Sequence, residues 1–154
     1  MRRSTAVAAL ALVIACEGKK EPRPDSSAPA AAPAAATTPA PTAAAMIVSP
    51  KRGDTTGVDV AVVLTKQGVS IEKASGTRVE GVGHYHLFLD TPPSAEGQPI
   101  PPTTKQIVHI GSGDSTFTFK GLAPGQHEII AVLGYGNHVP MPSRRDTVRF
   151  VVRR

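Results

Sequence analysis

Apolar and polar side chains alternate along residues 58–65. Val58, Val60, Val62 and Leu64 would lie on one side of an extended chain, which is the pattern of a strand with one buried face. From residue 46 onward, no window of a dozen residues shows the periodicity of a helix. We therefore predict that this part of the chain is all-β.

Similar short apolar runs recur up to the C-terminus at spacings near ten residues, separated by glycine and proline. The expected strands are residues 46–49, 58–65, 69–72, 84–90, 106–110, 115–119, 126–133 and 147–152. Short strands with turn formers between them are typical of two packed antiparallel sheets. The sequence predicts an immunoglobulin-like β-sandwich of about seven strands.

One turn between two expected strands resembles the corner at which the chain crosses between sheets in such sandwiches. It contains Leu122, Pro124 and Gly125, and His127 follows shortly after. In immunoglobulin-like domains, a ring-bearing polar residue at this place ties down the bend. We expect His127 to have this structural role rather than to bind a ligand.

The N-terminus has the features of an export signal. Arg2 and Arg3 precede an uncharged apolar run, residues 6–15, which is too short to span a bilayer and stops at Cys16. This arrangement resembles the bacterial lipoprotein box, which implies that Cys16 is acylated and becomes the first residue of the mature chain. Glu17 in the next position favours the outer membrane, with the domain facing the periplasm. The alternative is an ordinary signal peptide that leaves Cys16 as a free thiol.

A segment rich in alanine, proline, serine and threonine separates Cys16 from the expected domain. It has no apolar periodicity, and such a composition cannot offset the entropy lost on ordering. The expected organisation is therefore a signal peptide at residues 1–15, a lipidated cysteine with a disordered linker at 16–45, and a β-sandwich domain at 46–154.

Several function classes are excluded or disfavoured by what the sequence lacks. A single cysteine forbids an internal disulfide and a CxxC redox pair. No Walker loop, dinucleotide glycine motif or Gly-x-Ser-x-Gly elbow is present, so we expect no enzyme activity. Export and the absence of tryptophan disfavour nucleic acid as a partner.

The expected domain carries 12 basic and 9 acidic side chains, and arginines concentrate at its C-terminal end. Such a basic end could face anionic lipid, a polysaccharide or an acidic envelope protein. Alternatively, it is a charged sheet edge that discourages the addition of further strands.

All five histidines lie in the expected domain. His84 and His86 are two residues apart in a predicted strand, so both imidazoles would face one side and could turn toward one metal ion. A third ligand from His109 or His138 would complete a site suited to zinc or copper(II), and Met141 could add a soft ligand for copper(I). The alternative is that the paired histidines hydrogen-bond to loop backbone at the end of a sheet.

Several of these segments together resemble a bacterial family known as domain of unknown function 4399. They are residues 50–54, 83–90, 98–101, 122–127 and 133–140, together with His109. The resemblance covers most of residues 46–152 and implies no particular activity. Tyr85 and Gly136 depart from the family pattern, in which a further histidine and an acidic residue are frequent, and both departures remove possible metal ligands.

Taken together, these features predict a lipid-anchored, non-catalytic β-sandwich on the bacterial cell envelope that acts as a binding or interaction module. The sharper form of this hypothesis is that it binds copper or zinc through His84, His86, His109 and His138. The alternative from another class is an envelope hydrolase that uses a metal at the same histidines. Asp90, at the end of the paired-histidine strand, is expected to begin a turn rather than to act as a ligand or general base.

Overall fold

The computed structural model describes residues 42–143 and 145–154. Cys16, the expected signal peptide and most of the expected linker lie outside these residues. The described part belongs to one compact unit that extends to Arg154. It contains no helix, and therefore none that could cross a membrane.

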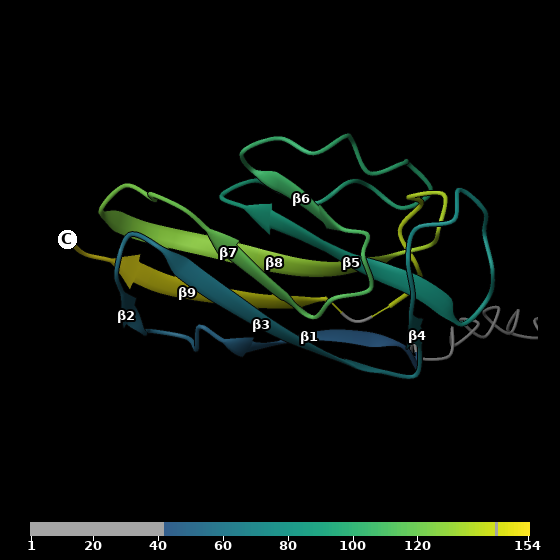
Figure 1. Cartoon of the computed structure of the whole chain (residues 1–154), viewed down its shortest axis with the longest axis horizontal. Helices are drawn as coiled ribbons and strands as arrows, with labels where there is room; N and C mark the ends of the chain where they lie inside the picture. Colours follow the sequence, from purple (N-terminus) through teal and green to yellow (C-terminus); the bar gives the residue numbers. More distant parts are fainter. Residues whose placement is uncertain (1–41, 144) are drawn as a thin grey trace, which may run out of the picture. The chain divides into compact units, whose positions relative to one another are not determined.

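Nine strands make up the described fold (Figure 1). They are β1 (Ala44–Ser49), β2 (Thr55–Thr56), β3 (Val60–Gln67), β4 (Ser70–Ile71), β5 (Val82–Leu89), β6 (Ile107–Ile110), β7 (Thr116–Phe119), β8 (Gly125–Gly134) and β9 (Asp146–Val152). Seven have four residues or more, and the other two have two residues each. The all-β sandwich predicted from the alternating runs is confirmed.

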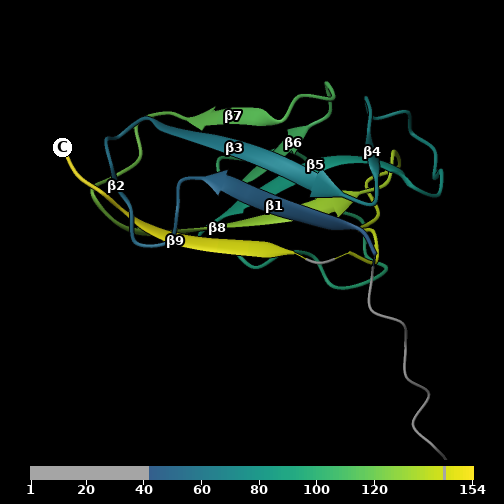
Figure 2. The ribbon, with the colours of Figure 1, turned by 90° about the horizontal axis from the view of Figure 1, so that it is seen from below.

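The strands form two sheets. The smaller sheet has the order β1-β3-β7, and Figure 2 shows β1 running beside β3. The larger sheet has the order β2-β9-β8-β5-β4, and β6 also pairs with β5. Strand β5 is therefore central, because β8 flanks it on one side and β4 and β6 share its other side.

The main core lies between the two sheets, and alternation along the strands explains it. Val60, Val62 and Leu64 of β3 are buried, as are Val148 and Phe150 of β9. Val58 departs from the prediction: it is 38% exposed because β3 begins only at Val60.

The first strand begins two residues earlier than the expected domain. Ala44 and Ala45, which fall within the expected linker, pair with Gln67 and Lys66 of β3 and are buried. Alanine has a low β propensity, so its run gives no strand signal. Its small side chain nevertheless fits against a packed sheet, and the domain boundary moves to Ala44.

A second, smaller cluster lies on the outer face of the larger sheet. Phe88 of β5 and Val132 of β8 are buried there with Ile100, which comes from the long connection between β5 and β6. This connection therefore covers part of the outer face, and the same region holds four of the five histidines.

Candidate metal centre

The structure brings His84, His86, His109 and His138 together. Each can offer one ring nitrogen such that all four nitrogens lie within 4.8 Å of one another. The ring centroids of His84 and His86 are 4.4 Å apart, and those of His109 and His138 are 4.6 Å apart. Among the described residues, this is the group of histidine, cysteine and acidic side chains placed to hold a metal ion.

Strand β5 supplies the two central members. Side chains two residues apart on a strand share a face, and His84 and His86 occupy the outer face. Tyr85 and Leu87, which alternate with them, belong to the main core. The antiparallel register then sets His109 of β6 directly opposite His86.

His138 comes from the loop that follows β8. Its backbone is in the left-handed region, with φ 63°, a conformation that histidine adopts more readily than most residues. Its backbone N–H donates to the Tyr135 carbonyl at 2.8 Å, and its carbonyl accepts from the Ile100 N–H at 2.8 Å. The loop is thus fastened both to itself and to the connection that covers the outer face.

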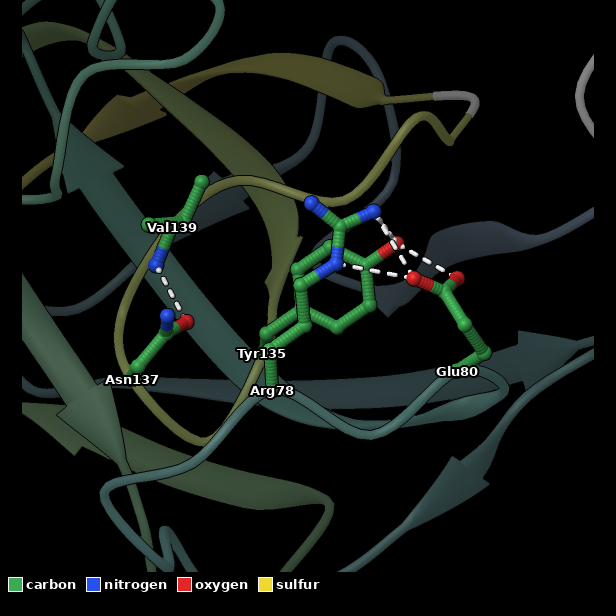
Figure 3. Close-up of polar contacts among 5 residues, drawn as sticks. All are labelled: Arg78, Glu80, Tyr135, Asn137 and Val139. Carbon is green, nitrogen blue, oxygen red and sulfur yellow. Dashed lines mark hydrogen bonds and ion pairs between the residues drawn. The ribbon is translucent and has the colours of Figure 1, made fainter.

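A polar network holds the same loop on its other side (Figure 3). The Tyr135 hydroxyl donates to Glu80 at 2.9 Å and accepts from Arg78 at 3.2 Å. The Arg78 guanidinium also lies over the Tyr135 ring, 4.3 Å from its centroid, and pairs with Glu80. Within the loop, the Val139 N–H donates to the Asn137 side chain at 3.3 Å. These contacts position the backbone that carries His138.

The two central imidazoles are buried without hydrogen-bond partners. His84 and His86 have no solvent exposure, and none of their four ring nitrogens has a hydrogen-bond partner among the described residues. Leaving one buried donor or acceptor unpaired costs about 1–3 kcal/mol, and native proteins leave few such groups. A metal ion would bind one nitrogen of each ring and remove part of this cost.

The surroundings of His84, His86 and His138 favour the neutral imidazole that metal ligation requires. Burial, together with the nearby His138 and His109, lowers the pKa of His84 to about 4. Burial and the other three rings lower the pKa of His86 to about 2. Burial and His109 also lower the pKa of His138. A metal ion would therefore not compete with protons for these three rings at neutral pH.

The tautomer of His109 follows from its contact with Pro101. Its Nε2 lies 2.8 Å from the Pro101 carbonyl oxygen, which can only accept, so Nε2 carries the proton. Nδ1 is then the nitrogen with a free lone pair. A ligating histidine commonly donates its other N–H to a carbonyl, which fixes the ring for metal binding.

A glycine makes room for the second buried ring. A Cβ atom on Gly134 would overlap Cε1 of His86 and lie 2.8 Å from its Nδ1. Gly134 pairs with His84 in the sheet. The absence of a side chain at this position therefore allows His86 to lie over the neighbouring strand.

Four imidazole nitrogens suit Zn²⁺ or Cu²⁺. With zinc–nitrogen distances of about 2.0–2.1 Å, a tetrahedral site places its nitrogens roughly 3.4 Å apart. Small side-chain rotations could reach this spacing from the arrangement observed. The cluster is therefore compatible with a four-coordinate metal centre.

A family model, Domain of unknown function (DUF4399), matches residues 62–153. The chain belongs to this family. The comparison with curated proteins gives no match. The DUF4399 match covers β5, β6 and the loop after β8, and therefore all four histidines of the cluster.

Two solved structures resemble the chain at low identity. The fibronectin(III)-like modules of CbhA from Clostridium thermocellum align at 16% identity and a TM-score of 0.40, covering 70% of this chain and 93% of theirs. The extracellular domain of a one-component system from B. thetaiotaomicron aligns at 12% identity and a TM-score of 0.41, covering 72% of this chain and 15% of that one. Neither likeness bears on the function of the DUF4399 domain.

Other residues singled out in the sequence lie away from the cluster. Met141 is buried in the main core, where its Sδ would lie 2.6 Å from a Cβ on Gly83. It is therefore on the opposite face of β5 from His84, and the expected copper(I) ligand is wrong. Tyr85 also faces the main core, so a histidine in its place would not join the cluster. At Gly136, a Cβ would overlap the backbone of Thr77.

His127 and Asp90 form a separate structural contact. His127 Nδ1 lies 2.7 Å from Asp90, and its Nε2 lies 2.8 Å from the Ala123 carbonyl at the corner before β8. Asp90 also accepts from the Glu128 N–H at 2.8 Å. The ring thus joins the corner to the end of β5, which is the structural role expected for His127.

The remaining polar candidates engage near neighbours. The Ser112 hydroxyl donates to Asp114 at 2.6 Å across the turn between β6 and β7, whereas His109 contacts Pro101. Near the C-terminus, Arg149 pairs across the strands with Glu128 at 2.6 Å.

Sequence reasoning missed the backbone features that shape the site. Pro101 acts through its carbonyl oxygen, and Gly134 acts through its missing side chain. The glycine beside a strand end carried a weak signal of close approach. The contact of His109 with Pro101 gave no signal in the sequence, because it depends on how the long connection between β5 and β6 folds over the sheet.

Proposed function

We propose that this chain is a non-catalytic metal-binding module that holds one Zn²⁺ or Cu²⁺ ion through His84, His86, His109 and His138. The observation that carries the proposal is the pair of fully buried imidazoles on β5, whose four ring nitrogens have no hydrogen-bond partner in the part of the chain that the structure describes. Two further imidazoles each offer a ring nitrogen within 4.8 Å of nitrogens on this pair.

The composition of the cluster supports a binding role. Catalytic zinc sites keep one position open for water, whereas sites with four protein ligands are closed. The cluster offers four imidazoles, and neither Asp90 nor another acidic side chain belongs to it. This favours a binding module over the alternative of a metal-assisted hydrolase.

The test is metal content and affinity. The full chain should take up one Zn²⁺ or Cu²⁺ per molecule, measured by elemental analysis after dialysis and by titration calorimetry. His84→Ala should abolish stoichiometric binding, and His127→Gln, at the fifth histidine, should retain it. Wild-type protein without stoichiometric zinc or copper would refute the proposal.

We also propose that the domain is held outside the cytoplasm, at a membrane of the cell envelope, by acylation of Cys16. Support comes from the basic start, the short apolar run and the position of the cysteine at its end. Two or more acyl chains suffice for stable anchoring. With the fold beginning at Ala44, residues 17–43 could reach roughly 80 Å from the lipid in extended conformation.

Intact-mass spectrometry tests the anchor directly. The mature chain should begin at Cys16 and carry the mass of acyl groups, and Cys16→Ser should release it from the membrane fraction. An outer-membrane location facing the periplasm follows from Glu17 if the host has two membranes. An envelope protein or a polysaccharide would then be within reach of the domain, and nucleic acid would not.

A further inference from the structure

The four histidines of the cluster differ in exposure, and this difference bears on how a metal would leave. His84 and His86 are fully buried on the central strand β5. His109 and His138 are half-buried. The inference developed from this difference rests on the proposed metal binding.

The half-buried histidines lie outside the central strand. His109 belongs to β6, which among the described strands pairs with β5 alone. His138 lies in a loop, in a backbone conformation that is sparsely populated for residues other than glycine. Their rings are neighbours, with centroids 4.6 Å apart. They form the accessible edge of the cluster, here named the His109–His138 edge.

The cluster also lies apart from the main core. The side chains that hold the two sheets together, such as Leu87 and Phe150, lie between the sheets. His84 and His86 point to the opposite face of β5. Loss of a metal would therefore leave the contacts between the sheets in place, unlike a structural zinc site, where metal and fold depend on each other.

We propose that the metal is transferred to and from an external nitrogen-donor ligand across the His109–His138 edge, while His84 and His86 hold it from within. The incoming nitrogen forms a bond to the metal with its lone pair, and the bond from the metal to His138 breaks. The His138 nitrogen regains its lone pair. The oxidation state of the metal and the number of its ligands are unchanged by this exchange. The bonds to His109, His84 and His86 then break in turn as further acceptor nitrogens bind, which completes the transfer.

The experiment measures zinc transfer from the loaded full chain to the chelator 4-(2-pyridylazo)resorcinol by stopped-flow absorbance. Ligand exchange at an accessible edge predicts an observed rate that rises in proportion to chelator concentration. A rate that does not depend on chelator concentration would mean that zinc leaves unaided, and would overturn the transfer proposal.

Variants assign the step to one side of the cluster. His138→Asn, chosen because asparagine tolerates the left-handed backbone, should keep zinc bound and raise the transfer rate at least tenfold. His109→Gln should act in the same direction if the loop variant does not fold. His127→Gln should leave the rate unchanged. Equal rates for wild-type protein and a folded, zinc-loaded His138→Asn variant would contradict the assignment.

A hexahistidine peptide as acceptor distinguishes two sources of the donor. A rate that rises with peptide concentration supports transfer to histidine side chains of a partner protein. Transfer to the chelator but not to the peptide supports small-molecule acceptors. Failure of wild-type protein to bind zinc would remove the proposed function as well, whereas bound zinc with a chelator-independent rate would remove only the transfer proposal.

Discussion

The imidazole of His86 occupies space that a side chain on Gly134 would take. A Cβ atom built on Gly134 overlaps Cε1 of the ring, and it also lies 3.4 Å from Cδ1 of Ile100. The backbone at Gly134 cannot move away easily, because it pairs with His84 of β5 and forms a bridge with Pro140. The His86 imidazole must therefore be displaced when Gly134 is replaced by a larger residue.

We accordingly expect Gly134→Ala to weaken zinc binding at least tenfold by displacing His86 from the cluster. The measurement is a competitive zinc titration. Gly57→Ala is the matched control, because a Cβ atom at Gly57 meets nothing within 4 Å and its backbone is not left-handed. Unchanged affinity in Gly134→Ala would show that His86 is not a ligand or that its ring can rearrange.

Replacing His86 by leucine should separate stability from metal binding. The substitution removes two unpaired buried nitrogens, and an apolar group of similar size can be neutral or stabilising at such a place. The metal-free variant should therefore be at least as stable as the wild type in urea unfolding, and it should bind no stoichiometric zinc. A marked loss of stability would argue that His86 has a structural role.

Leu87 is the natural comparison, because it is the next residue on β5 and faces the opposite way. It is fully buried in the main core, where truncation of a leucine to alanine costs about 2–5 kcal/mol. Leu87→Ala should thus lower the free energy of unfolding by this amount, and the folded fraction should still bind zinc. An unchanged free energy of unfolding in Leu87→Ala would contradict the assignment of Leu87 to the core-facing side of β5.

The sequence predicted the strands well, because apolar and polar residues alternate wherever one face of a strand is buried and the other is exposed to solvent. It could not tell which face of β5 the histidines occupy. Tyr85 and Leu87 on one side and Phe88 on the other are all buried, since the connection containing Ile100 covers the outer face. Both faces of β5 therefore carry buried apolar residues, and the pattern does not distinguish them.

Local strand geometry predicts that His84 and His86 share a face. It does not predict that His109 and His138 lie beside them. His109 lies opposite His86 because of the register between β5 and β6, and a shift of one residue would turn it away. His138 depends on a loop held by Tyr135 and Ile100. These are long-range relationships that the order of residues alone does not specify.

The hydrogen bond between His109 and Pro101 predicts a definite tautomer. In metal-free protein, the proton should reside on Nε2 of His109, because the Pro101 carbonyl can only accept. Long-range ¹H–¹⁵N spectra of the imidazole rings measure this directly. With zinc bound, the resonance of Nδ1 should shift and Nε2 should remain protonated. A metal-induced shift at Nε2 would mean that the contact with Pro101 breaks on binding.

The contact of His127 with Asp90 and Ala123 predicts a pH dependence of stability. Burial by itself lowers the pKa of His127, but the hydrogen bond to the Ala123 carbonyl and the Asp90 carboxylate raise it above its usual value of 6.5 in net effect. Both ring nitrogens face acceptors, an arrangement that only the protonated ring satisfies. Protonated His127 therefore stabilises the folded state.

The direction in which stability changes with pH follows from the linkage between proton binding and folding. A group with a raised folded pKa contributes its full stability below the unfolded pKa, and this contribution is lost as the pH rises through the folded pKa. The lowered pKa values of His84, His86 and His138 act in the opposite direction. Because the unfolded rings still bind protons near pH 6.5, the contribution of His127 is measured as the difference between wild-type protein and a His127 variant.

Between pH 6.5 and 8.5, the stability of wild-type protein relative to His127→Gln, measured by urea unfolding, should fall with rising pH. Glutamine keeps one donor but cannot carry the charge that attracts Asp90. His138→Asn is the control: because the pKa of His138 is lowered in the fold, its replacement should change the pH profile in the opposite sense to the replacement of His127. Parallel profiles for wild type and His127→Gln would show that the imidazole stays neutral in the fold and contributes nothing through its charge.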